Sequence, residues 1–313
     1  MNPFLRINHI NIKHMRKLFF LFIFVSVSVL VFGQEQNPTV VKRFKINEYS
    51  VQAGIFGGAP AISTLADFNI LAPNSVLLNS NLIPNPASYY PYYYQRGPNS
   101  MFSAMLGFQF SDKQKTKYNK NLQLRVGITY FHNSVLSAGL YNTERVTFDT
   151  LTSSQTGSLT FVDSLITKGL NMNYSSEQLR LDGALIFRTN PDARFSLYSG
   201  IGFTAGFSFN AKTTIRYSID YQIVHRIPNE YTEHRKSFSG DSETEVITNK
   251  NNFGFSAYIP LGINLKLGNK TEFWKKVNLF YEIRPSINIT YIPELKTVTN
   301  SFVHFGGGFR ILL

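Results

Sequence analysis

The sequence predicts an all-β protein, a single antiparallel transmembrane β-barrel of about eight strands. Only 16% of the residues are charged, whereas 28 Phe, 17 Tyr and 21 Gly give a high aromatic and glycine content. The mean hydropathy of −0.10 is too polar for a bundle of membrane-spanning helices. Eight segments alternate between apolar and polar or small residues, which is the period of a strand with one apolar face.

The N-terminus has the pattern of a secretory signal peptide over residues 1–33. Met15-Arg16-Lys17 is followed by an almost wholly apolar stretch, 18–32, and a small-residue cleavage site before Gln34. Met15 is a candidate for the true start, because residues 1–14 resemble an upstream extension. An uncleaved anchor is the alternative, but the apolar stretch is short for a spanning helix.

The mature chain is predicted to consist of a short periplasmic segment, 34–43, and the barrel, 44–313. It contains no Cys, which excludes disulfides, a thiol nucleophile, Cys-ligated zinc and a lipoprotein anchor. A closed barrel suits such a chain, because all its backbone groups are paired without an open edge.

The eight alternating segments are each long enough to cross a membrane as a tilted strand. In the last of them, Val303, Phe305 and Phe309 alternate with His304 and Gly306. The segments are 45–57, 102–110, 122–130, 178–188, 195–210, 253–267, 277–290 and 303–313.

The connections alternate in length, which indicates the topology. Long links, about 58–101, 135–176 and 211–251, alternate with short turns such as 111–121 and 190–193. With the N-terminus on the periplasmic side, the long links are expected outside and the tight turns inside. A soluble barrel is the alternative, but its apolar face would point inward.

Charged residues on the polar faces are expected to lie inside the barrel, where space exists only for side chains. We expect Arg125 to pair with Asp182, and Glu282 with Arg310, because each pair lies on adjacent strands. Arg180 and Arg284 would then share acids or bind an anion. The alternative places some of these six residues at a water-filled rim.

The long links are the expected place of recognition. The first link carries a tyrosine cluster that predicts either an interfacial aromatic belt or a recognition surface. These residues are Tyr89, Tyr90, Tyr92, Tyr93 and Tyr94. The near-repeats at 147–151 and 160–165 predict a hairpin extending outward, and 212–224 predicts strands that continue past the membrane.

Motifs of catalysis and cofactor binding are weak, and the sequence predicts no catalytic residue, metal site or cofactor. Gly200, Gly202 and Ala205 imitate a dinucleotide fingerprint, but they lie inside a strand pattern rather than a strand-to-helix turn. The mature histidines have no metal spacing. Four cations of the net charge of +12 belong to the expected signal peptide, which leaves (31 − 4) − 19 = +8 for the mature chain. Its lysines lie in turn-like clusters, which are typical of solvated turns near lipid head groups rather than of a nucleic-acid surface.

The chain resembles small outer-membrane β-barrels of Gram-negative bacteria, in the PorT-like and OmpA-membrane-domain-like group. The resemblance rests on MRKLFFLFIFVSVSVLVFG, on LRLDGALIFRTNPDARFSLYSGIGFTAGFSFNA and on the ending SFVHFGGGFRILL, and it covers about 44–313. It implies outer-membrane localisation and insertion by a barrel-assembly machinery, but not one activity. Many such barrels end in an aromatic residue, whereas this chain ends in Leu313.

Three functions follow as hypotheses. The first is a non-enzymatic anchor or accessory subunit of a cell-surface or secretion complex, with recognition by the long external loops. The second is a narrow, anion-preferring small-solute channel, and the third is a membrane-embedded hydrolase. The expected partners are outer-membrane lipid and a protein of the complex.

Overall fold

The computed structural model describes residues 43–58, 60–80, 90–92, 99–111, 117–226, 233–268, 271–295 and 297–313, with only the backbone described at 90–92 and 233–235. The expected signal peptide and nearly all of the segment 34–43 lie outside the described residues. Both remain predictions.

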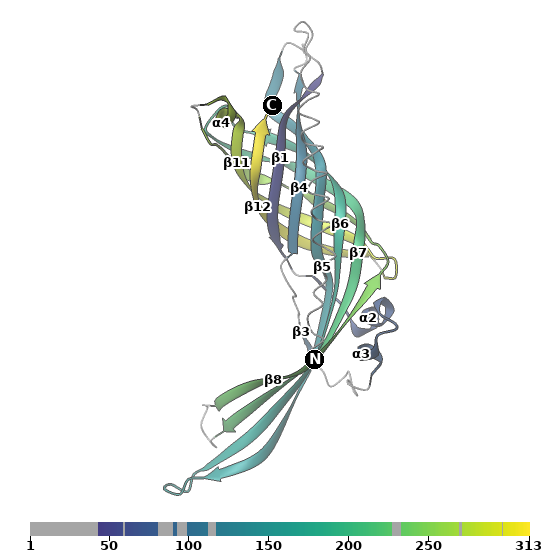
Figure 1. Cartoon of the computed structure of the whole chain (residues 1–313), viewed down its shortest axis with the longest axis vertical. Helices are drawn as coiled ribbons and strands as arrows, with labels where there is room; N and C mark the ends of the chain where they lie inside the picture. Colours follow the sequence, from purple (N-terminus) through teal and green to yellow (C-terminus); the bar gives the residue numbers. More distant parts are fainter. Residues whose placement is uncertain are drawn as a thin grey trace, which may run out of the picture.

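A single antiparallel sheet closes into a ring of eight strand positions, because β1 pairs with both β4 and β12 (Figure 1). One position is shared by β9 and β10, which both pair with β7 and β11. In chain order the ring strands are β1 (Phe44–Gly57), β4 (Asn99–Ser111), β5 (Tyr118–Thr152), β6 (Leu159–Arg188), β7 (Phe195–Arg226), β9 (Phe253–Tyr258) with β10 (Leu261–Lys266), β11 (Val277–Tyr291) and β12 (Thr297–Leu312).

The eight segments expected from alternation all lie in these strands, so their number and order are confirmed. The expected strand 253–267 is divided into β9 and β10 at Ile259 and Pro260. Proline has no N–H to donate to the sheet, which explains why the strand is interrupted at Pro260. The registers of Tyr258 with Ser286 and of Leu261 with Ile283 show that both pieces keep one alignment against β11.

The connections at one end of the ring, which we call the turn end, are the short ones. They join β4 to β5, β6 to β7, and β10 to β11, the last through helix α4 (Glu272–Lys276), whose N-cap is Thr271. The three long connections leave the opposite end, as expected. The link between β11 and β12 also lies at that opposite end although it is short, so link length alone does not assign every connection.

Strands β5, β6 and β7 continue far past the ring and are joined by β8 (Glu233–Asn249) in a four-stranded extension (Figure 1). We call its portion next to the ring the neck (135–141, 169–176, 211–218 and 242–249) and its outer portion the arm (142–152, 159–168, 219–226 and 233–241). The expected outward hairpin and continuing strands are confirmed. The assignment of 44–313 to one barrel with long extensions remains a prediction.

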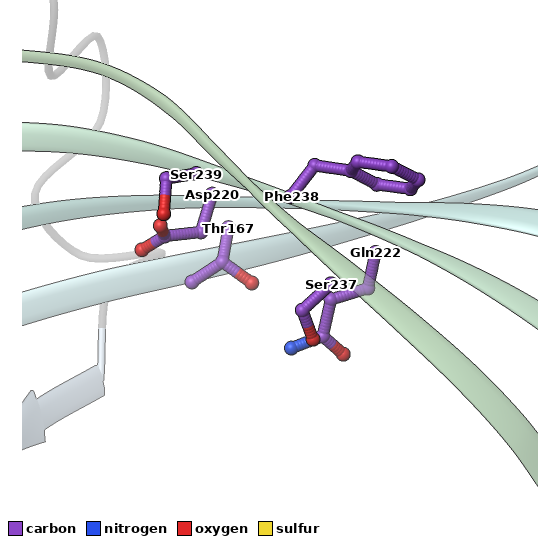
Figure 2. A pocket seen from close by; sticks show the side chains of 6 residues that line it. All are labelled: Thr167, Asp220, Gln222, Ser237, Phe238 and Ser239. Atoms are coloured by element: carbon purple, nitrogen blue, oxygen red, sulfur yellow. The ribbon is translucent and has the colours of Figure 1, made fainter.

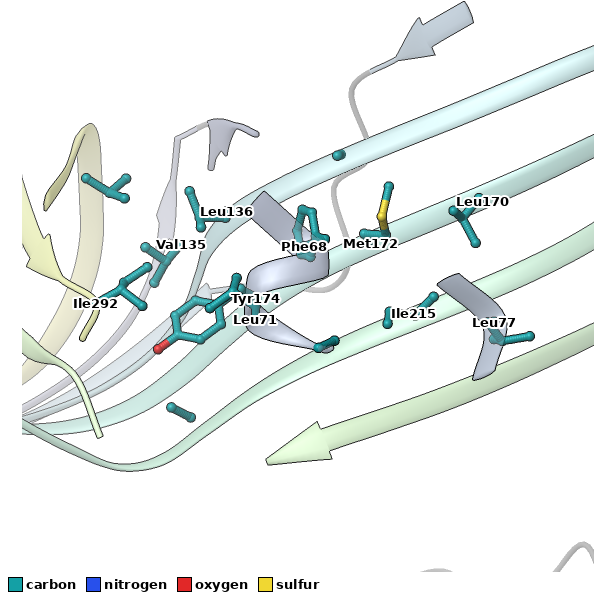
Figure 3. Close-up of a cluster of buried hydrophobic side chains, with 14 of the residues drawn as sticks. Phe68, Leu71, Leu77, Val135, Leu136, Leu170, Met172, Tyr174, Ile215 and Ile292 are labelled. Carbon is teal, nitrogen blue, oxygen red and sulfur yellow. The ribbon is translucent and has the colours of Figure 1, made fainter. Parts of the chain in front are cut away.

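Two helices from the connection between β1 and β4 pack on the neck (Figure 3). This connection contains β2 (Ala61–Ile62), α2 (Leu65–Leu71), α3 (Val76–Asn79) and β3 (Tyr90–Tyr92). Phe68 of α2 is fully buried in an apolar cluster with residues of the neck strands and of the link between β11 and β12. Glu245 of β8 accepts hydrogen bonds from the Ser75 hydroxyl (2.5 Å) and the Val76 amide (3.0 Å) at the start of α3. The two helices therefore contact the neck strands through both apolar packing and hydrogen bonds.

No helix among the described residues combines the length and apolarity needed to cross a membrane.

Candidate functional site

The ring interior holds eight charged side chains, each at most 5% exposed. They come from β1, β5, β6, β11 and β12, and all of them except Arg180 form ion pairs with one another. They are Glu48, Arg125, Arg180, Asp182, Arg188, Glu282, Arg284 and Arg310. We call this set the interior cluster.

Near the turn end, Glu48 forms ion pairs with three arginines. The register of β1 against β4 shifts between Ile46 and Glu48, a bulge that buries both Asn47 and Glu48. Arg188 Nη2 lies 2.6 Å from one carboxylate oxygen of Glu48. The other oxygen is 3.2 Å from Arg310 Nε and 3.3 Å from Arg125 Nε. One carboxylate therefore faces three guanidinium groups.

Asp182 is held by three donors from three strands. Tyr258 donates from its hydroxyl to Asp182 Oδ1 (2.5 Å), and Thr129 donates to Oδ2 (2.7 Å). Arg284 Nη1 lies 3.3 Å from the same Oδ2. Both oxygens of the carboxylate therefore have partners, as buried charge requires.

Glu282 links the Glu48 group to Asp182. It accepts a hydrogen bond from the Tyr198 hydroxyl (2.7 Å) and forms ion pairs with Arg125 (3.2 Å) and Arg284. Arg284 pairs with both Glu282 and Asp182, so the two acids share one guanidinium.

Arg180 differs from the other arginines because its hydrogen-bond acceptors are neutral. It donates to Gln178 (2.6 Å), Ser256 (2.5 Å), Asn288 (2.8 Å) and Thr204 (3.3 Å). The ring of Phe131 also lies 4.8 Å from its guanidinium carbon.

Interior glycines provide the room for these large side chains. At several positions, four of which concern the interior cluster and its tyrosines, an added Cβ would overlap a neighbouring interior side chain. The pairs are Gly107 with Glu48, Gly202 with Tyr258, Gly254 with Arg180, and Gly262 with Tyr198. The interpretation of Gly202 as a small interior residue, rather than as part of a nucleotide loop, agrees with this geometry.

All six charged residues expected inside the ring lie there, but the pairing differs. Arg125 pairs with Glu48 and Glu282 rather than with Asp182, and Arg310 pairs with Glu48 rather than with Glu282. For Arg125 the expected partner was wrong because its side chain reaches Glu282 across the narrow interior, whereas Arg310 pairs with Glu48 on its other neighbouring strand, β1.

Sequence reasoning missed Glu48 and Arg188 as members of the cluster. Both follow the same two-residue period as recognised inward positions: Glu48 precedes Ser50 and Gln52, and Arg188 follows Asp182. Strict extension of the period to the strand ends would have found them.

The outer face of the ring is apolar on every strand. One exposed large apolar side chain per strand position shows this: Ile55 (60%), Phe102 (38%), Ile128 (45%), Leu181 (70%), Phe207 (67%), Ile263 (50%), Ile287 (55%) and Phe309 (59%). A continuous apolar surface of this extent is unusual for a soluble monomer. The ring is thus apolar outside and charged inside.

The arm is a sheet with exposed apolar side chains on its strands. They are Val146, Phe148, Leu151, Leu159, Tyr221 and Phe238. A shallow pocket of about 250 Å³ lies on the arm, lined by Thr167, Asp220, Gln222, Ser237, Phe238 and Ser239 (Figure 2).

Asp163 is a buried acid on β6 in the arm, and it accepts hydrogen bonds from side chains of β5 and β7. Thr147 donates to Oδ1 (2.6 Å), and Arg226 Nε donates to Oδ2 (3.3 Å). Arg145 Nε lies 3.7 Å from Oδ2. The Thr147 hydroxyl, and next the Arg226 guanidinium, hold the pKa of the Asp163 carboxyl below its usual range.

The side chains of the expected tyrosine cluster are not among those that the structure describes. Tyr89, Tyr93 and Tyr94 lie outside them, and only the backbone of Tyr90 and Tyr92 is described, in β3 against β5. The part of the chain that the structure describes contains no group of three or more His, Asp or Glu able to hold a metal ion.

Comparisons with known proteins place the chain in no family. No family model matches it, and no curated protein matches it. It is similar to Neisserial surface protein A, with 9% identity and a TM-score of 0.30, over 87% of this chain and 100% of that one. It is also similar to Ail, the attachment invasion locus protein of Yersinia pestis, with 15% identity and a TM-score of 0.24, over 85% of this chain and 100% of that one. Because these TM-scores are low, no function transfers from either protein to this chain.

Proposed function

We propose that the chain is an integral outer-membrane β-barrel protein, exported through a cleaved signal peptide. We further propose that it is a non-enzymatic anchor or accessory subunit of a cell-surface or secretion complex. The observation that carries this proposal is the inverted ring, with apolar side chains exposed on all eight strand positions and charged side chains buried inside.

Lipid explains this inversion. A ring whose backbone hydrogen bonds are all made between strands, without an open edge, is one of the two structures that can span a bilayer. Lipid tails would cover the apolar surface, which water would otherwise contact at a cost of roughly 25 cal/mol per Å². A soluble barrel would require apolar residues in the interior instead.

The packed interior supports an anchor rather than the alternative channel. The eight charged side chains are at most 5% exposed, so water hardly reaches them. An eight-stranded barrel has an interior wide enough only for side chains. Without a rearrangement of the interior cluster, solutes have no open path at this depth.

The arm supports recognition outside the membrane. A membrane-crossing strand needs about 9–11 residues, whereas β5, β6 and β7 contain 35, 30 and 32 residues. More than half of each strand therefore extends beyond the bilayer. Because short turns face the periplasm in such barrels, the arm would face the outside of the cell.

Surface labelling of intact cells tests the orientation. An epitope inserted in the turn between β5 and β6 (153–158) should be accessible to antibody on intact cells, while one inserted at 190–193 should require permeabilised cells. Heat-modifiable migration of both variants is the folding control. Recovery of the mature chain in the soluble fraction would contradict membrane insertion.

A mild-detergent pulldown then tests the anchor role. A tagged chain whose arm is shortened between Thr147 and Asp163 should lose a stoichiometric companion that the full chain retains. The same set of proteins with both chains, or none with the full chain, would contradict recognition by the arm, and a bilayer conductance of the purified chain would favour the channel.

A further inference from the structure

The interior cluster has more positive than negative charge. Among the described residues it contains five arginines and three acids, Glu48, Asp182 and Glu282, and all eight are buried. An arginine side chain does not lose its proton in proteins. The excess positive charge therefore has to be compensated by another group or by bound water, since an uncompensated buried charge is very costly.

The uncompensated charge is concentrated around Arg125 and Arg310. These two share Glu48 with Arg188, and Arg125 alone of the three has a second acid, Glu282. Arg180 does not need a further hydrogen-bond acceptor, because four neutral oxygens already accept hydrogen bonds from it.

The same arginines carry hydrogen-bond donors that have no acceptor in the described part of the chain. Nη2 of Arg125 and Nη2 of Arg310 are buried and have no acceptor among the described residues, and the same is true of Arg188 Nε. The guanidinium carbons of Arg125 and Arg310 lie 4.7 Å and 5.2 Å from the centre of the same ring, that of Tyr198. The Nη1 atom of Arg310 donates to Asn264 Oδ1 (2.8 Å), and its other aromatic neighbour, Phe280 at 4.7 Å, supplies no oxygen acceptor.

We infer that the ring binds a small monovalent anion of the size of chloride at Arg125 and Arg310, near the turn end. A halide accepts several N–H donors at once and needs no donor of its own, which matches two guanidinium edges. Complete burial excludes a large oxyanion. The site is independent of any partner of the arm.

Thermal unfolding at constant ionic strength tests the site. The purified mature chain in detergent is heated in chloride or in gluconate, which is too large to enter, and unfolding is followed by gel mobility and circular dichroism. The wild-type Tm should rise by several degrees with chloride and saturate, since a ligand that binds only the folded state stabilises it. Arg310→Gln should remove this dependence, whereas Arg194→Gln, at an exposed turn, should keep it.

Crystals of the wild-type chain grown in bromide provide a direct measurement, which also decides the matter if Arg310→Gln does not fold. An anomalous peak beside the Nη2 atoms of Arg125 and Arg310 is the expected result. Equal Tm values in chloride and gluconate, with no bromide peak in the ring, would overturn the inference and leave water as the compensating group. Membrane insertion, tested separately by fractionation, would stand in either case.

Discussion

Glu48→Gln is the substitution that most directly tests the interior cluster. Gln keeps the size of the side chain but removes the charge that faces Arg125, Arg188 and Arg310 at distances of 2.6–3.3 Å. Only Glu282, already shared with Arg284, would remain near these three cations.

The expected loss is large because the side chain is fully buried. Removing one partner of a buried ion pair costs about 3–5 kcal/mol. For a domain of this size, 1 kcal/mol corresponds to about 2–4 °C in Tm, so we expect Tm to fall by at least ~6 °C. Restoring the balance with Arg188→Gln in the same chain should recover part of the loss, because one uncompensated cation is then removed.

The assay is the temperature at which the folded band disappears on unboiled gels, checked by circular dichroism. Glu272→Gln is the matched control, since this carboxylate on α4 is 85% exposed and should leave Tm unchanged. A Glu48→Gln chain that unfolds within a degree of the wild type would refute the argument that Glu48 compensates buried arginine charge.

Four further predictions use the same measurements. Glu282→Gln should lower Tm by several degrees in detergent, because Arg125 and Arg284 lose a shared acid. Gly254→Ala should destabilise the ring by displacing Arg180, whereas Gly183→Ala, with open space at its Cβ, should be tolerated in the same unfolding assay. Leu181→Arg, on the apolar outer face, should cost about 2–4 kcal/mol in folding into liposomes if the ring spans lipid at this residue, and a neutral effect would contradict that placement. Because the pKa of Asp163 is lowered in the folded arm, its contribution to arm stability is complete above about pH 4 and is lost as the pH falls through the folded-state pKa. Limited proteolysis should therefore cut the arm faster in acid. The Asp163→Asn chain should show the same faster cleavage at neutral pH.

The sequence by itself determined the strands and their faces. Alternation depends only on neighbouring residues, because successive side chains of a strand point to opposite faces. The inward positions of Arg125, Arg180 and Asp182 therefore followed from the period. So did the outward position of Leu181 and the continuation of β7 past the ring.

Only the tertiary structure decided which charges meet. Glu48 is distant in sequence from Arg188 and Arg310, and although the period predicts that Glu48 points inward, it does not predict that these three side chains meet. The partners of Arg125 lie across the interior rather than on a neighbouring strand, because closure of the sheet brings opposite strands within reach of long side chains. The packing of α2 on the neck was also decided by the tertiary structure, because Phe68 is buried by strands that are distant from it in sequence. Local periodicity fixes the face of each residue, whereas closure of the sheet fixes its neighbours.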